Sequence, residues 1–219
     1  LAEQFRTPVV LLIDEVIGHL VETVHVPDPA SLDVVDRKWA DVAADKYRPY
    51  EAGKDMVPAM ARPGDGYRVH TTGLTHDESG FPTQDPETVD RVSKRLLNKF
   101  DPHRKVIDHF EELNVKDAEG LIVSYGISAR AARGAVKQAR DAGIKAGLFR
   151  PVTIWPFPEK ALVKAAKKAK RILVAEMNAG QLSLEVERVL GRDRVSGVNR
   201  IDGEAISPAD IIDAIGKGA

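Results

Sequence analysis

Turns that follow apolar, strand-like segments carry the residues that could do chemistry in this chain of 219 residues. Gly126 and Ser128 lie where a strand gives way to a helix, so backbone N–H groups and the helix dipole could hold a phosphate there. The turn has a single glycine and lacks the Lys-Ser or Lys-Thr pair of a P-loop. An ordinary strand-to-helix turn is therefore the favoured interpretation, and phosphate binding is the alternative.

A second turn follows the apolar residues 172–175 and carries Glu176, Asn178 and Gln181. In open α/β sheets ligands bind at the carboxyl ends of the strands, so these side chains are candidates for a functional role. Asn and Gly before a helix are equally well explained by capping and turn chemistry. Both interpretations stay open.

A third turn contains Trp155 and Phe157 within a stretch that also holds three prolines, between residues 150 and 158. Prolines stiffen this segment, and aromatic side chains held with little conformational entropy suit a contact surface. Local packing is the competing explanation, and it has equal weight.

A polar loop brings His70 and His76 together with two acidic residues, Asp77 and Glu78, which raises the question of a metal. The spacing matches no helical two-histidine motif, so a solvated loop is favoured over a metal site. The sequence contains no complete catalytic constellation. We therefore assign no catalytic, cofactor-binding or metal-binding residue, and treat all of these positions as interface or loop candidates.

The elements that position these turns alternate between short apolar strands and amphipathic helices. Strands are expected at 121–125, 146–149, 172–175 and 195–198, and helices at 128–142, 158–169, 181–190 and 208–215. Such alternation predicts an α/β fold, with a mainly parallel open sheet and flanking helices.

The first half of the chain lacks this alternation. Residues 9–13 form a continuous apolar run, which predicts a strand buried on both faces of a parallel sheet. Residues 26–86 hold seven of the 13 prolines and resemble an extended connector, followed by expected helices at 85–98 and 102–113. We therefore expect residues 1–25 to end one domain, 26–114 to connect, and 115–219 to form a second domain, so that the chain begins inside a domain.

Composition narrows the function classes. The formal net charge of −1 gives no general attraction to nucleic acid or anionic membranes, and no apolar run is long enough to span a bilayer. The absence of cysteine excludes disulfides, thiolate metal sites and an iron–sulfur cluster ligated by this chain. These features suit a cytoplasmic protein.

Five motifs, in their order along the chain, resemble the alpha subunits of 2-oxoacid:ferredoxin oxidoreductases, and most closely the 2-oxoglutarate synthase type. The matching segments are Arg6 to Glu15, Thr72 to Gly80, Ser124 to Gly126, Trp155 to Pro158 and Val174 to Gln181. The resemblance covers nearly the whole chain.

The resemblance implies an enzyme that decarboxylates a 2-oxoacid oxidatively, reduces ferredoxin and forms an acyl-coenzyme A and CO₂. It implies that residues 1–25 end a pyrimidine-binding domain and that 115–219 form a transketolase C-terminal-like domain. Thiamine diphosphate, Mg²⁺ and an iron–sulfur cluster would be held elsewhere in the complex, which would include a beta subunit and, in some members, gamma and delta subunits. This fragment would be structural and inactive alone.

Other classes compete with this interpretation. One is a non-catalytic α/β docking module, and another is the C-terminal part of a transketolase or a 2-oxoacid dehydrogenase. Within the resembled family, 2-oxoglutarate is favoured over pyruvate or a branched-chain 2-oxoacid because of the loop around residues 70–80.

Overall fold

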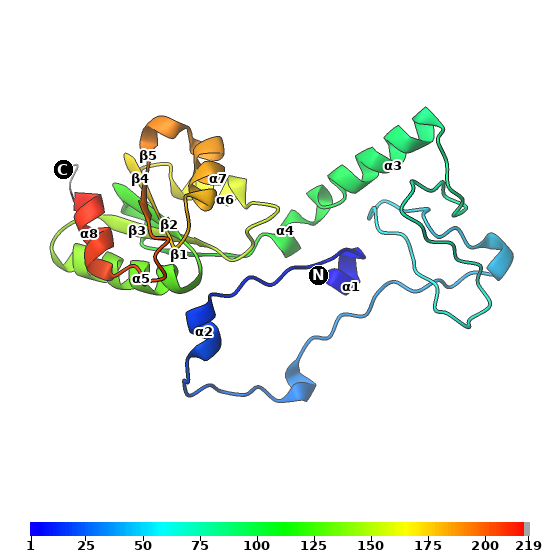
Figure 1. Cartoon of the computed structure of the whole chain (residues 1–219), viewed down its shortest axis with the longest axis horizontal. Coiled ribbons are helices and arrows are strands. Elements are labelled where there is room, and N and C mark those ends of the chain that lie inside the picture. Colours follow the sequence, from blue (N-terminus) through cyan, green and yellow to red (C-terminus); the bar gives the residue numbers. More distant parts are fainter. Residues whose placement is uncertain (217–219) are drawn as a thin grey trace. The chain divides into compact units, whose positions relative to one another are not determined.

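The computed structural model describes residues 1–216, which divide into two units. Unit 1 consists of Leu1–Leu11 and Glu22–Ile107, and unit 2 consists of Leu12–Val21 and the residues from Asp108 onward. The chain therefore leaves unit 1 for one short segment, returns to it, and leaves again. Figure 1 shows the elements of each unit.

Unit 2 is built on a five-stranded sheet in the order β1-β3-β2-β4-β5. Its strands are β1 (Phe110–Leu113), β2 (Gly120–Ser124), β3 (Ala146–Pro151), β4 (Arg171–Glu176) and β5 (Val195–Asn199). β2 pairs in parallel with β3 and β4, and β4 with β5, whereas β1 runs antiparallel to β3 at one edge. The prediction of a mainly parallel open sheet is confirmed.

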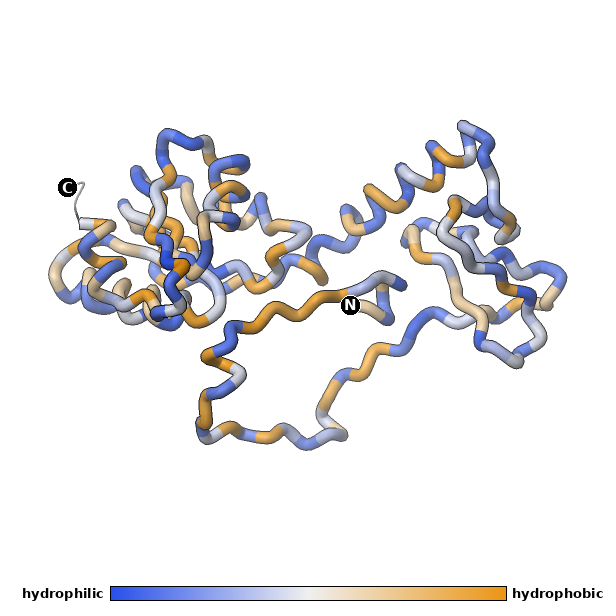
Figure 2. The backbone as a smooth tube through the Cα atoms, in the orientation of Figure 1, coloured by the Kyte–Doolittle hydropathy of each residue, from blue (hydrophilic) through white to orange (hydrophobic). Residues whose placement is uncertain are grey.

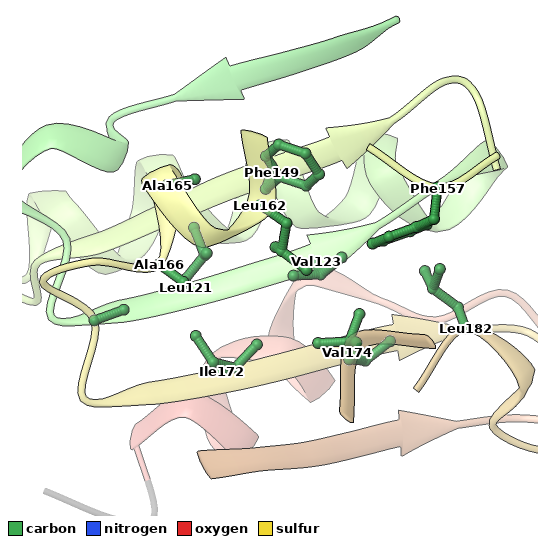
Figure 3. Packing of buried hydrophobic residues seen from close by; sticks show 12 residues of the cluster. Leu121, Val123, Phe149, Phe157, Leu162, Ala165, Ala166, Ile172, Val174 and Leu182 are labelled. Carbon is green, nitrogen blue, oxygen red and sulfur yellow. The ribbon is translucent and has the colours of Figure 1, made fainter. Parts of the chain in front are cut away.

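Helices cover both faces of this sheet (Figure 1). Side chains alternate along each strand, so Leu121 and Val123 face one layer while Ile122 faces the other. The first layer contains α6 (Glu159–Ala165) and α7 (Gln181–Leu190), and the second contains α5 (Gly126–Asp141) and α8 (Pro208–Gly216). Figure 3 shows the first layer, in which Leu162 and Leu182 pack against β2 and β4.

Short elements complete unit 2. They are α2 (Glu15–His19) and the 3₁₀ turns η4 (Val115–Asp117) and η5 (Arg192–Arg194). Helix α8 begins with a capping box, in which the backbone N–H groups of Ser207 and Asp210 each donate to the other residue's side chain. This cap agrees with the expected helix at 208–215.

The expected helix at 102–113 is wrong in its second half. The structure has a 3₁₀ turn η3 (Asp101–His103), a short helix α4 (Arg104–Ile107) and then strand β1. The edge of β3 offers backbone partners to Phe110–Leu113, and the Phe110 ring stacks on Phe149 with centroids 5.4 Å apart. These long-range contacts outweigh the helical spacing of the apolar residues.

Unit 1 holds α1 (Ala2–Phe5), η1 (Pro29–Ser31), η2 (Ala44–Lys46), α3 (Pro86–Asn98), η3 and α4, joined by extended chain. Its buried core is small and consists of Phe5, Val57 and Ile107 with Phe100 packed against them. The carboxylate of Asp85 accepts a hydrogen bond of 2.9 Å from the N–H of Thr88, so the predicted start of α3 is confirmed.

The predicted strand at residues 9–13 is absent. This run is extended and unpaired, and between 54% and 82% of each side chain is exposed. Figure 2 shows it as a hydrophobic stretch that follows α1. The apolar pattern was the sequence signal for a strand, but no strand of residues 1–216 lies beside it to supply hydrogen bonds.

Candidate functional site

The candidate site lies in unit 2, at the carboxyl ends of the adjacent strands β2 and β4. Tyr125 follows β2 directly, and Asn178 follows β4 by two residues. The amide nitrogen Nδ2 of Asn178 donates a hydrogen bond of 2.8 Å to the Tyr125 hydroxyl oxygen. Parallel pairing of the strands brings these two loops to one edge of the sheet, which we call the carboxyl edge.

Glu176 is the buried charged group of this edge, with none of its surface exposed. Its carboxylate accepts hydrogen bonds from the backbone N–H groups of Leu182 at 2.8 Å and Ser183 at 2.9 Å, and from the Ser183 hydroxyl at 2.8 Å. These donors belong to the first turn of α7, where the helix dipole also favours negative charge. Glu176 therefore caps α7 and fixes where this helix begins.

Asn178 shapes the turn between β4 and α7. Its side-chain oxygen accepts hydrogen bonds from the N–H groups of Gly180 at 2.9 Å and Gln181 at 3.3 Å. These bonds agree with the capping interpretation for Asn178, while its Nδ2 group reaches across to Tyr125. The capping role of Glu176 was not predicted. Gln181 is exposed and enters this network through its backbone.

Tyr125 carries the chemistry that this edge can offer. Partial burial raises the pKa of its hydroxyl, and the negative charges of Glu176 and Asp14 raise it further. The hydroxyl is therefore neutral near pH 7, and its oxygen is the acceptor for Asn178. Its O–H remains a donor suited to an oxygen atom of a bound molecule or a neighbouring chain.

The side chain of Asp14 contacts the first turn of α5. Its carboxylate accepts a hydrogen bond of 2.7 Å from the N–H of Ile127. A Cβ atom at Gly126 would lie 2.2 Å from the same carboxylate, which leaves no room for a side chain. Gly126 also has a positive φ of 57°, a conformation that favours glycine.

This contact bears on the phosphate alternative at Gly126 and Ser128. The chain's own carboxylate lies where a phosphate would meet the helix N-terminus, and the Ser128 side chain is buried. The structure therefore favours the strand-to-helix turn. Sequence analysis missed the role of Asp14, whose signal was only an acidic residue after an apolar run.

The aromatic turn divides into two different environments. Phe157 is buried against Leu162 and Leu182 in the first core layer (Figure 3), whereas 77% of Trp155 is exposed. Local packing therefore explains the presence of Phe157. Of the two aromatic residues, Trp155 is the one whose side chain is available as a contact surface.

His70 and His76 belong to unit 1. His76 is buried, its ring stacks on Tyr50 with centroids 5.0 Å apart, and its Nε2 lies 3.1 Å from the hydroxyl of Thr72. The ring of His70 meets that of His76 edge-on at 5.6 Å. Within residues 1–216 no three His, Asp or Glu side chains gather as metal ligands would.

A cavity of about 210 Å³ opens beside the first turn of α5. Among the arginines that line it, Arg133 at 2.7 Å and Arg150 at 2.9 Å share one carboxylate, that of Glu111. Its lining residues are Ile17, Gly126, Ala129, Arg130, Arg133 and Arg150.

Comparison with family models matches two consecutive parts of the chain. Residues 1–94 match the pyruvate flavodoxin/ferredoxin oxidoreductase, thiamine diP-binding family, and residues 118–211 match the pyruvate:ferredoxin oxidoreductase core domain II family. The second match covers the parallel strands β2, β3, β4 and β5 of unit 2.

Curated relatives agree with these matches. The chain is 40% identical over 99% of its length to 2-oxoglutarate synthase subunit KorA of Methanothermobacter thermautotrophicus, and covers 58% of that subunit. It is 32% identical over 98% of its length to ketoisovalerate oxidoreductase subunit VorB of the same organism, and covers 53% of it. The chain thus spans little more than half the length of these relatives.

Among solved structures, the fold is similar to a 2-oxoglutarate:ferredoxin oxidoreductase from Magnetococcus marinus, solved with 2-oxoglutarate, coenzyme A and succinyl-CoA bound. The TM-score is 0.80 at 24% identity, over 87% of this chain and 34% of that one.

None of the helices in residues 1–216 has the length and apolar character that crossing a bilayer requires.

Proposed function

The chain belongs to the alpha-subunit family of the 2-oxoacid:ferredoxin oxidoreductases, and from this membership we propose that it works within an enzyme that oxidises 2-oxoglutarate. The reaction would cleave the bond between the carboxylate and the carbonyl carbon, release CO₂, and join the remaining acyl group to the sulfur of coenzyme A. The electron pair left by the broken bond would pass to ferredoxin, and the thiol proton would go to solvent.

The observation that carries this proposal is the 40% identity to subunit KorA over nearly the whole chain. Identity to the ketoisovalerate subunit is lower, at 32%, which favours 2-oxoglutarate over a branched-chain 2-oxoacid. We propose a beta subunit as partner, with gamma and delta subunits in some complexes, and a cytoplasmic location consistent with a chain that has no cysteine.

The described residues do not fit the full set of cofactors. Mg²⁺ prefers carboxylate oxygens, but residues 1–216 bring together no such group of ligands, and the sequence has no cysteine for an iron–sulfur cluster. Mg²⁺, the diphosphate it accompanies and the cluster belong, in this proposal, to other parts of the complex.

The chain's own residues would serve assembly. Glu176 and Asp14 fix the starts of α7 and α5, and the Asn178–Tyr125 hydrogen bond joins the two loops at the carboxyl edge. This rigid edge presents the neutral Tyr125 hydroxyl and, on the neighbouring loop, the exposed Trp155. Such a combination of an aromatic anchor and a hydrogen-bond donor suits contact with another protein surface.

We also propose that the chain has three segments. Residues 1–25 end a pyrimidine-binding domain, residues 26–114 form a connector, and residues 115–219 form a transketolase C-terminal-like domain. The exposed apolar run at residues 9–13 supports it, because such a run is stable when a sheet buries it on both faces. The match of residues 1–94 to a thiamine diphosphate-binding family supports the assignment of the first residues, although it extends beyond residue 25.

The test is to purify the native complex through an affinity tag on this polypeptide and measure its mass, its partners and its activity. We expect ferredoxin reduction that depends on both 2-oxoglutarate and coenzyme A, at a kcat/KM above that for pyruvate or 2-oxoisovalerate. The isolated 219-residue chain serves as the control, and we expect it to reduce no dye.

Three outcomes would contradict the proposal. Reduction of NAD⁺ in place of ferredoxin would indicate a 2-oxoacid dehydrogenase, and a polypeptide of 23.9 kDa that copurifies with no partner would favour the docking module. Higher kcat/KM with 2-oxoisovalerate would keep the enzyme class and change the substrate.

A further inference from the structure

Three cationic side chains of unit 1 lie close together without a matching carboxylate. Lys99 is the C-cap of helix α3 and keeps only 6% of its surface exposed, with its ammonium 5.2 Å from the Phe100 ring centroid. Arg95 lies one helical turn before Lys99. Phe5 and Phe100, the chain neighbours of Arg6 and Lys99, meet edge-on with ring centroids 6.1 Å apart. Burial lowers the pKa of Lys99 most, and the positive charges of Arg95 and then Arg6 lower it further.

The two arginines are held by backbone carbonyl groups. Arg6 donates to the carbonyl oxygens of Pro49 at 2.8 Å and Ala59 at 3.4 Å, and Arg95 donates to that of Met56 at 3.2 Å. Carbonyl groups satisfy the donors but carry no net charge. The cluster therefore stays positive after its hydrogen bonds are counted.

Neighbouring carboxylates do not neutralise the cluster. Glu78 acts on Arg95, but it forms an ion pair of 2.8 Å with Arg91, and no ion pair within residues 1–216 joins a carboxylate to Lys99. The negative end of the α3 dipole offsets only part of one charge. Lys99 is buried, and Arg6 and Arg95 are partly buried. Charges withdrawn from water are normally paired, so these three unmatched cations are suited to an anion from outside the chain.

We propose that Arg6, Arg95 and Lys99 form a binding site for an oxyanion, the carboxylate or phosphate group of a small-molecule ligand. Two planar guanidinium groups provide paired donors that match the oxygens of either group, and the ammonium provides a third point of charge. This site is distinct from the carboxyl edge of unit 2. The inference does not depend on the proposed function, because it is tested by binding to the chain itself.

The experiment is thermal unfolding and calorimetric titration of the full 219-residue chain at constant ionic strength. Inorganic phosphate and 2-oxoglutarate are the two probes, with NaCl replacing each probe in the reference samples. We expect a saturable rise in the unfolding midpoint with at least one probe. Stronger binding of phosphate would identify a phosphorylated ligand, and stronger binding of 2-oxoglutarate a carboxylate ligand.

The decisive variant is Lys99→Met, which keeps the length of the side chain and removes its charge. We expect this variant to unfold at the same or a higher temperature than the wild type without an anion, because a buried unmatched charge is removed, and to bind the probe about tenfold more weakly. Lys94→Met is the matched control, since Lys94 is an exposed residue of the same helix that pairs with Asp90 at 2.7 Å. This control should bind the probe as the wild type does.

A second readout does not depend on a variant. The pKa of the Lys99 ammonium, followed by carbon NMR of its side chain, should rise when the probe is added, because a bound anion favours the charged form. The proposal is overturned if neither probe shifts the midpoint or this pKa in the wild type. It is also overturned if Lys99→Met binds as tightly as the wild type.

Discussion

The carboxylate of Asp14 accepts a hydrogen bond of 2.7 Å from the backbone N–H of Ile127, a residue 113 positions further along the chain. The bond places a negative charge at the positive end of α5 and holds residues 12–21 against the rest of unit 2. Stability of this unit should therefore depend on a residue far from it in the sequence.

Replacement of Asp14 tests this bond. Asp14→Ala should lower the free energy of unfolding by about 1 kcal/mol, as the loss of a helix cap does, and Asp14→Asn by less, because the amide oxygen can still accept the bond. Hydrogen exchange of the Ile127 amide, which should become faster in Asp14→Ala, locates the effect. An exchange rate equal to that of the wild type would refute the assignment, and the exposed Asp33→Ala serves as control.

Gly126→Ala should destabilise the chain through two separate effects. The new Cβ atom would meet the Asp14 carboxylate, and the positive φ costs a non-glycine residue about 1–2 kcal/mol. Gly143→Ala isolates the second effect, because Gly143 has a φ of 83° and open space around it. In a double-mutant cycle measured by urea unfolding, Asp14→Ala should relieve part of the cost of Gly126→Ala, and strictly additive costs would contradict the contact.

Glu176→Gln should reveal how much the cap of α7 contributes. A glutamine would turn an NH₂ group toward N–H donors that now meet a carboxylate, so we expect a loss of about 1–3 kcal/mol in the free energy of unfolding. The exposed Glu204→Gln should stay within about 0.5 kcal/mol of the wild type. Equal stability of the two variants would show that the buried carboxylate is not required.

Phe157 and Trp155 offer a comparison within one turn. Phe157→Ala removes a ring from the core and should cost about 3–5 kcal/mol, whereas Trp155→Ala should cost less than about 1 kcal/mol. Unfolding midpoints of both variants check this order. If Trp155→Ala were the more damaging change in the isolated chain, the surface assignment of its side chain would be wrong.

Asp202 should titrate at an unusually low pH. Hydrogen bonds from the Arg200 guanidinium, and then from the N–H of Glu204, lower its pKa to about 2. Because the pKa is lower in the folded state, the stabilising effect is complete above the pKa of the unfolded chain and is lost as the pH falls through about 2. Carbon NMR of the carboxyl group measures this pKa, and Arg200→Gln should raise it toward the ordinary value of Asp.

The fold of unit 2 could be predicted because its signals are local. An apolar run such as 172–175 lies within the strand that it predicts, and the capping residues Ser207 and Pro208 lie at the start of the helix that they predict. The strand Phe110–Leu113 could not be predicted, because its partner β3 follows some 35 residues later and the local spacing also fits a helix. A pattern reports which residues are apolar, but it does not report whether a partner strand exists.

Only part of the candidate site could be anticipated from the sequence. Glu176, Asn178 and Gly126 could be named as candidates because each lies next to a strand end in the sequence. Asp14 and the three-cation cluster were missed, since they arise from contacts between segments far apart in the chain, and no local rule relates Arg6 to Lys99.

The Asp14–Ile127 bond also has a consequence for the order in which the chain folds. Joining residues 113 positions apart closes a long loop, which costs conformational entropy on the order of 4 kcal/mol, more than one capping bond returns. We therefore expect residues 12–21 to attach after the sheet of unit 2 has formed its own core. Attachment leaves most of their apolar side chains exposed, so in the folded chain this segment is fixed mainly by the hydrogen bond of Asp14.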